Sequence, residues 1–297
     1  MNNLTKGMWM GMIGVVTFSL TLPATKLAVP VFGAIPSAFY RSSIAGIIAI
    51  IYVWLYKPPV PKLKDVLPLS IIGLLIAFVF PVGIAIAMKD LPSAHGGVVL
   101  GLSPLFTAFF ATIRFGERPS VAFWLTAIAG SALVVLFSLY QGGGYLQISD
   151  IALIIAAVSA SYGYAEAGNL AQTMGGKEVV TWAMVLSLVP AIPVSIYFAY
   201  QAGWHDFALL DLPYVAISAL LFVSIFPAYI GNVYWYSALA LGGISHIGQV
   251  QLLQPFLTLI FASFLLTESI TMTNLGFALV VLIIVVIGKK MRVRRVS

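Results

Sequence analysis

The stretch HGGVVLGLSPLFTAFFATIRFGE, residues 95–117, returns 151 positions later as HIGQVQLLQPFLTLIFASFLLTE, residues 246–268. Nine of the 23 aligned positions are identical: His, Gly, Val, Leu, Pro, Thr, Phe, Ala and Glu. Similarity of this length at one fixed offset indicates an internal repeat. The chain therefore contains two related halves, and the fold depends on how these halves are oriented.

Composition places both halves in a membrane. Of the 297 residues, 61% are hydrophobic and only 8% are charged, and apolar runs of about 20 residues are long enough to cross a bilayer as helices. The run that follows Lys6 has no cleavage-site pattern, so we interpret it as a retained helix and not as a signal peptide. Ten spans are predicted, at residues 7–29, 36–56, 66–88, 94–113, 121–140, 151–171, 179–200, 213–239, 244–266 and 271–288.

Lysine and arginine are distributed unequally between alternate loops. Twelve lie on one side of the predicted spans, and only Lys89 lies on the other. The twelve are Lys6, Lys57, Lys62, Lys64, Arg114, Arg118, Lys177, Lys289, Lys290, Arg292, Arg294 and Arg295. Because positive residues concentrate in cytoplasmic loops, we predict that both termini lie in the cytoplasm.

The orientation of the two halves follows from the number of spans. Five spans per half is an odd number, so the second half enters the membrane upside down relative to the first. We therefore interpret Arg114 and Arg118 as orientation signals, and the repeated Glu117 and Glu268 as part of the duplicated unit. The prediction is an all-α integral membrane protein with ten transmembrane helices in two inverted five-helix repeats, residues 1–146 and 147–297.

Several kinds of function are disfavoured by what the sequence lacks. The chain has no cysteine and three widely separated histidines, so neither a disulfide framework nor a metal site is expected. The glycines at 142–144 are not followed by the Lys-Ser or Lys-Thr of a phosphate-binding loop, and no catalytic triad is present. Membrane orientation accounts for the net charge of +6. We predict no enzyme, no cofactor and no nucleic-acid partner.

Five motifs resemble a known family. They are LPATKLA (Leu22–Ala28), IPSAFYRSSIAG (Ile35–Gly46), GERPS (Gly116–Ser120), YWYSALALGGISHIGQVQLLQP (Tyr234–Pro255) and TESIT (Thr267–Thr271). In order, spacing and duplication they resemble the EamA branch of the drug/metabolite transporter superfamily. This resemblance implies a central cavity lined mainly by helices 1, 3, 4, 6, 8 and 9. It also implies export of amino acids or related small metabolites.

Glu166 is the acid that the sequence analysis selects first. It lies about sixteen residues into the sixth helix, roughly 24 Å from the outer end. We interpret Glu166 as a proton-binding or amine-binding carboxylate, because desolvation favours the neutral form, and place Tyr162 in the same site. The alternative is a structural acid that is bonded to a neighbouring helix or to cytoplasmic water.

Lys26 and Arg41 are two cations near the outer ends of helices 1 and 2. Snorkelling toward the interface is one interpretation. Holding a substrate carboxylate, or closing an outer gate, is the other. An ion pair between Lys26 and Glu166 is disfavoured, because their depths in the membrane differ by about 20 Å.

Histidines and prolines supply candidate gates. His95 and His246 occupy equivalent positions in the repeat, one on each side, which suggests paired gates that sense pH. Interfacial histidines bonded to helix ends are the alternative. Proline removes a backbone hydrogen bond and can kink a helix, so we predict flexing points at Pro23, Pro104, Pro227 and Pro255.

Two polar faces occur in the eighth and ninth helices. By helical spacing, each brings three polar side chains onto one side. They are Tyr229, Asn232 and Tyr236 in the eighth helix and Gln251, Gln254 and Thr258 in the ninth. Polar side chains are unfavourable against lipid, so these faces line either a substrate cavity or a helix interface.

Together these features predict a secondary transporter of the bacterial inner membrane. We expect it to export a small metabolite, with amino acids favoured, by alternating access and with protons as the coupling ion. Organic cations, drugs or nucleoside-like metabolites are the alternative substrates. A membrane-embedded enzyme is disfavoured by the missing reactive groups, and a passive channel by the inverted repeat.

Overall fold

A computed structural model describes residues 3–141, 147–203, 213–289 and 293–295, which form ten continuous helical segments. Several segments contain more than one element, and the first half runs α1 (Asn3–Ser19) with α2 (Thr21–Phe32), α3 (Ala34–Tyr56), α4 (Leu63–Gly73) with α5 (Phe80–Asp90), α6 (Ser93–Leu100) with α7 (Ser103–Phe115), and α8 (Val121–Gln141). The second half runs α9 (Ile148–Met174), α10 (Gly176–Gln201), α11 (Tyr214–Ile225) with α12 (Asn232–Gly242), α13 (Ile244–Gly248) with α14 (Gln254–Leu266), and α15 (Met272–Lys289).

These segments agree with the predicted spans to within four residues at each end. Eight helices of the described chain are long and apolar enough to cross a membrane. The other two segments are α8 and α15. The predicted all-α membrane fold with ten helices is thus confirmed.

Regular α-helical geometry breaks near the predicted prolines. Helices α7 and α14 carry Pro104 and Pro255, which are equivalent in the repeat, in their first turns, and a turn at Leu20 precedes Pro23. The Phe226–Gly231 segment, which contains Pro227, is a π-helical turn. A second π turn, Leu74–Val79, lies between α4 and α5. Side chains bond carbonyls at both π turns: Ser42 donates to Ala77, and Asn232 donates to Pro227 and Ala228.

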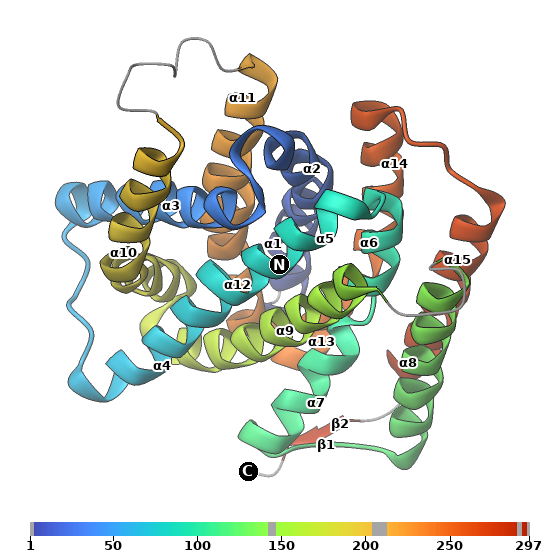
Figure 1. Cartoon of the computed structure of the whole chain (residues 1–297). Coiled ribbons are helices and arrows are strands. Elements are labelled where there is room, and N and C mark those ends of the chain that lie inside the picture. Colours follow the sequence, from blue (N-terminus) through green and yellow to red (C-terminus); the bar gives the residue numbers. More distant parts are fainter. Residues whose placement is uncertain (1–2, 142–146, 204–212, 290–292, 296–297) are drawn as a thin grey trace.

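The packing of helices follows the inverted repeat. Helix α6 packs against α14, and α7 packs against α13, so the fourth and ninth segments cross in opposite directions. Likewise α1 contacts α12, α2 contacts α11, and α9 contacts both α4 and α5. Helix α3 packs on α10, and α8 stands beside α15 at one edge of the molecule (Figure 1). Each contact in one half thus has a counterpart in the other.

Close approach of α1 and the eighth segment depends on small residues. A Cβ added at Gly231 would collide with Thr17 Oγ1, and one at Gly14 would lie 3.3 Å from the Gly231 carbonyl oxygen. Small residues allow two helix backbones to meet closely in a membrane, where packing replaces the hydrophobic effect as the driving force. These glycines therefore set the distance between the first helix and the second half.

One short two-stranded ribbon accompanies the helices of the described chain. Strand β1 (Glu117–Pro119) follows α7 and pairs antiparallel with β2 (Val293–Arg295) near the C-terminus. Figure 1 shows this ribbon at the lower end of the bundle, below α7 and α8. The backbone of the GERPS motif is thus tied to the end of the chain.

Candidate functional site

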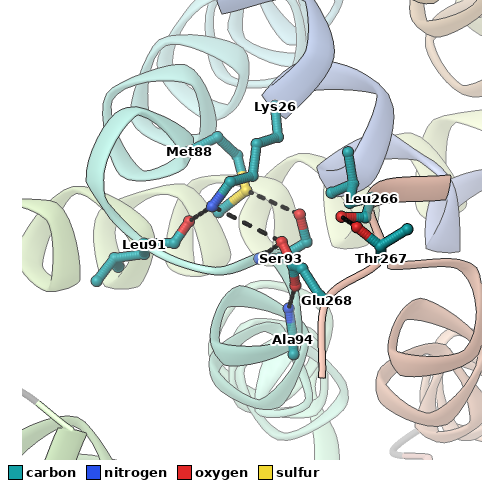
Figure 2. A network of polar contacts seen from close by, with 8 residues as sticks. All are labelled: Lys26, Met88, Leu91, Ser93, Ala94, Leu266, Thr267 and Glu268. Carbon is teal, nitrogen blue, oxygen red and sulfur yellow. Dashed lines mark hydrogen bonds and ion pairs between the residues drawn. The ribbon is translucent and has the colours of Figure 1, made fainter. Parts of the chain in front are cut away.

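Glu268 joins three segments at one end of the bundle (Figure 2). Its Oε1 and Oε2 atoms accept hydrogen bonds from the backbone N–H groups of Ser93 at 2.9 Å and Ala94 at 3.1 Å. Lys26 Nζ lies 3.7 Å from Glu268 Oε1 and donates to the Leu91 carbonyl oxygen at 2.6 Å. We call these five residues the Glu268 network. Its carboxylate satisfies free N–H groups at the positive end of α6.

The Glu268 network changes the interpretation of Lys26. Snorkelling predicts an ammonium directed to water, but the structure places it between a carbonyl and a carboxylate. The network ties α2 and the start of α6, in the first half, to the connection between α14 and α15 in the second. Lys26 thus belongs to a contact between the halves.

His95 is paired with an acid that the sequence analysis did not select. Its Nε2 lies 2.8 Å from Asp150 Oδ1, and the two side chains are 3% and 1% exposed. The other Asp150 oxygen accepts from the backbone N–H of Gln147 at the start of α9, and the His95 ring packs 4.9 Å from that of Phe137. This buried pair also joins the halves. The side chain of His246 lies outside the described residues.

His95 and Arg114 lie at opposite ends of the fourth segment, which consists of α6 and α7. Glu166, on α9, is bonded to Arg114. Arg114 Nε and Nη2 donate to Glu166 Oε1 at 2.8 and 2.5 Å, and the Tyr162 hydroxyl donates to the same atom at 3.1 Å. The Glu166 side chain is 5% exposed and that of Arg114 is 48% exposed. Arg114, which we interpret as an orientation signal, thus also has a local partner. The arginine reaches back from the end of α7 to a buried acid.

The three polar residues predicted to share one face of the eighth segment contact different helices in the structure. The Tyr229 hydroxyl hydrogen-bonds the Thr181 hydroxyl of α10 at 2.8 Å, whereas Tyr236 packs 6.2 Å from the ring of Tyr164 on α9. Asn232 donates its side-chain amide to the carbonyls of Pro227 and Ala228, which belong to the π turn. A π turn contains more residues per turn than an α-helix, so spacing across it does not keep one face.

The polar face of the ninth segment is buried against helix 1. Gln251 Nε2 donates to Gln254 Oε1 at 3.1 Å. Ser19 Oγ donates to the Gln254 carbonyl at 3.4 Å, and Thr258 Oγ1 donates to the Ser19 carbonyl at 3.2 Å. These bonds place the break in the ninth segment beside the break in the first.

Six buried polar atoms of the described chain lack a hydrogen-bond partner. They are Thr107 Oγ1, Asn232 Oδ1, Trp235 Nε1, Tyr236 OH, Gln249 Oε1 and Gln251 Oε1. We call them the unpaired polar set. All six lie on the fourth, eighth and ninth segments, and the fourth and ninth are the helices that cross between the halves. Buried polar atoms are normally paired, so such a cluster points to a ligand or to water.

An aromatic cluster adjoins the unpaired polar set. The ring of Phe18 on α1 lies 5.9 Å from those of Tyr164 and Trp235, and Tyr164 and Trp235 are 5.8 Å apart. These residues come from the first, sixth and eighth segments. Aromatic walls with a few convergent polar atoms are typical of small-molecule sites.

Arg41 lies apart from all three ion pairs of the described chain. It is 5% exposed on α3, and its guanidinium carbon lies 5.8 Å from the centre of the Phe80 ring. With Thr25 and Ser37 it lines a small cavity that α11 closes through Leu220 and Val223. Unlike Lys26, Arg41 is a buried cation that has no acidic partner in the described part of the chain.

A family model for EamA-like transporters matches residues 5–139 and again residues 147–288. The chain belongs to the EamA-like transporter family. The resemblance of the five motifs is thereby confirmed, and the protein is a multi-pass membrane transporter. The EamA assignment places the repeat, the crossing helices and the unpaired polar set in a chain that moves a small molecule across a bilayer.

Relatives of this EamA chain are transporters. The uncharacterized transporter YdeK of Bacillus subtilis is 40% identical over 97% of this chain and 96% of the relative. A probable terminal-alkyne amino-acid exporter of Streptantibioticus cattleyicolor (85% and 83% covered) and the pseudopaline exporter CntI of Pseudomonas aeruginosa (85% and 79% covered) are each 22% identical. A solved crystal structure with a TM-score of 0.63 covers 94% of both chains at 18% identity and has the same fold.

Of the unpaired polar set in this EamA chain, the sequence analysis selected Tyr236, Asn232 and Gln251. It did not select the neighbouring Trp235 and Gln249. It also missed the roles of three residues that bind selected ones: Arg114, Asp150 and Glu268. One signal was available. The glutamate of the repeat is retained at position 268 although the adjacent arginines are not, which is expected if the carboxylate has a local structural role.

Proposed function

We propose that this EamA transporter is a secondary carrier that exports a small metabolite, with amino acids favoured, by alternating access. We further propose that it lies in the inner membrane with both termini in the cytoplasm. The observation that carries the proposal is the unpaired polar set at the crossing of the two halves. Leaving a buried polar atom unpaired costs about 1–3 kcal/mol, so a bound substrate would recover that free energy.

The chemistry of the unpaired polar set favours an amine-bearing substrate. Three of its atoms are amide oxygens, on Asn232, Gln249 and Gln251. An ammonium group carries three donors and no acceptor, so it complements carbonyl oxygens. One relative supports this proposal, because it is named as a probable terminal-alkyne amino-acid exporter.

Alternating access is supported by the paired contacts of the inverted halves. One half rocking against the other exposes a central site first to one side and then to the other. The Glu268 network and the His95–Asp150 pair both join the halves at the end that we propose to face outward. Arg118 and the other loop cations support this orientation.

Proton coupling through Glu166 stays a prediction. To bind a proton during transport, this carboxylate must first separate from Arg114. We expect Glu166→Gln to flatten the dependence of the transport rate on pH, because a glutamine amide cannot bind the coupling proton. If the full pH dependence remains while the variant still transports, Glu166 is a structural acid.

Counterflow in proteoliposomes tests the carrier directly. Vesicles are loaded with a pooled, unlabelled amino-acid mixture, and the transient accumulation of each labelled amino acid is followed. Accumulation of any one establishes a carrier and identifies its substrate. If folded protein gives no accumulation with amino acids but does so with an organic cation or a nucleoside, the carrier stands and the amino-acid assignment is wrong.

Gln249→Met tests whether the unpaired polar set binds substrate. Methionine has a similar volume and needs no hydrogen bond, so we expect the melting temperature to stay the same or to rise. Counterflow is expected to fall at least about tenfold, because one amide oxygen is lost. Gln172→Met, at an exposed position of α9, is the control. Equal counterflow in both variants would remove Gln249 from the substrate site.

A further inference from the structure

Arg41 is a buried charge that forms no ion pair with any Asp or Glu among the residues that the structure describes. Every Asp or Glu that forms an ion pair in the described chain pairs with Lys26, His95 or Arg114. The cavity beside Arg41 is mostly apolar, with walls that include Ala28, Leu220 and Val223, and its other polar side chains are the neutral Thr25 and Ser37. A guanidinium is costly to desolvate, and the face of the Phe80 ring offsets only part of that cost. Such a residue is retained where an anion neutralises it during function.

We propose that Arg41 binds the carboxylate of the transported substrate, an inference that rests on the proposed carrier function. The guanidinium fork matches a carboxylate with two parallel hydrogen bonds. Lys26 cannot take this role in the same conformation, because its ammonium is held by Leu91 and Glu268. Arg41 is the buried cation of the described chain that is free to receive a substrate.

The cavity beside Arg41 lies at a boundary between the two halves. Its walls on one side are Thr25, Ser37 and Pro81 of the first half, and α11 of the second half supplies the other side. It leaves about 10 Å³ for the centre of a water molecule, which is room for about one water. A carboxylate is larger, so it binds only when α11 moves away from α3. Movement of the halves thus controls access to the charge.

The position of Arg41 also connects it to the unpaired polar set. Its guanidinium lies over the ring of Phe80, and Phe80 belongs to the same buried cluster as Tyr164, Trp235 and Tyr236. An amino acid offers an ammonium to the amide oxygens and a carboxylate to Arg41. A substrate that is only cationic is repelled by the same guanidinium, which separates the proposed substrate class from organic cations.

The test compares carboxylates with their amides on purified protein in detergent. The probes are the twenty amino acids, acetate, lactate and succinate, each beside the matching amide, and the readout is the melting temperature. At least one carboxylate is expected to raise the melting temperature while its amide does not. Arg41→Met should abolish this shift, and Arg41→Lys should weaken binding at least about tenfold, because the fork is lost. Lys89→Met, which removes an exposed cation, should keep the shift.

The ligand-free proteins give a second readout. Arg41→Met is expected to melt about 2–4 °C higher than the parent, because it removes an uncompensated buried charge. Melting several degrees lower would mean that Arg41 has a structural partner and would overturn the proposal. Absence of any carboxylate-dependent shift in the parent would overturn it too. If the parent and Arg41→Met give equal counterflow of an organic cation, the carrier function stands and the proposed carboxylate site is wrong.

Discussion

Glu268→Gln is expected to increase by about 30-fold the rate at which a thiol at the Arg41 cavity reacts with a membrane-impermeant maleimide from outside. The chain has no cysteine, so Ser37→Cys supplies a single reactive group on the cavity wall. Glutamine keeps the size of the side chain but loses the charge that holds Ser93, Ala94 and Lys26. Charged hydrogen bonds contribute about 2 kcal/mol, which corresponds to a factor of about 30 in the population of the open conformation.

Two further variants make this experiment specific. Lys26→Met should change the labelling rate in the same direction, because it removes the cation from the same network. Glu178→Gln, in the first turn of α10, lacks any contact with the Glu268 network and should leave the rate unchanged. Equal rates in the parent and in Glu268→Gln would show that closure at this end does not depend on the network. Labelling only from the opposite side of the membrane would reverse the proposed orientation.

Asp150→Ala is expected to produce the largest loss of stability among single substitutions at these sites. The change removes the acceptor of both His95 and the Gln147 N–H. Removing one member of a buried pair costs about 3–5 kcal/mol, so the melting temperature should fall by about 10 °C. Asp65→Ala is the matched control, since Asp65 also lies in the first turn of a helix. It should cost about 1 kcal/mol or less.

A double variant separates the pair from the helix end. His95→Leu with Asp150→Leu removes both buried polar groups, and replacing both partners with apolar side chains costs less than breaking the pair. Its melting temperature should therefore lie above that of Asp150→Ala. If Asp150→Ala and Asp65→Ala lose the same stability, the bond to His95 contributes nothing, and Asp150 acts only as a helix cap.

The fold was predictable because its determinants are local or repeated. Apolar run length gives the ten segments, and the offset between His95 and His246 gives the duplication. An odd number of helices per half then requires inversion. The π turns at Leu74–Val79 and Phe226–Gly231 were not predictable in the same way, because they depend on how neighbouring helices satisfy freed carbonyls. The division at residue 146 stays a prediction.

The site was only partly predictable because pairing depends on tertiary contacts. Glu166 and Arg114 are 52 residues apart, and nothing in the sequence indicates that α7 ends beside the middle of α9. The same limit applies to Lys26 and Glu268. Polar residues on the eighth and ninth segments were identifiable, but which of their atoms remain unpaired is decided by packing.

The crossing of α6 with α14 and of α7 with α13 has an energetic consequence for the proposed cycle. If each half can adopt the geometry that the other now has, the opposite conformation is the same arrangement with the two halves exchanged. Contacts made by residues that are identical in the two halves then contribute equally to the free energies of both conformations. The resting equilibrium is decided only by positions at which the halves differ, so a substitution there changes the equilibrium, whereas a matched pair of substitutions leaves it unaltered.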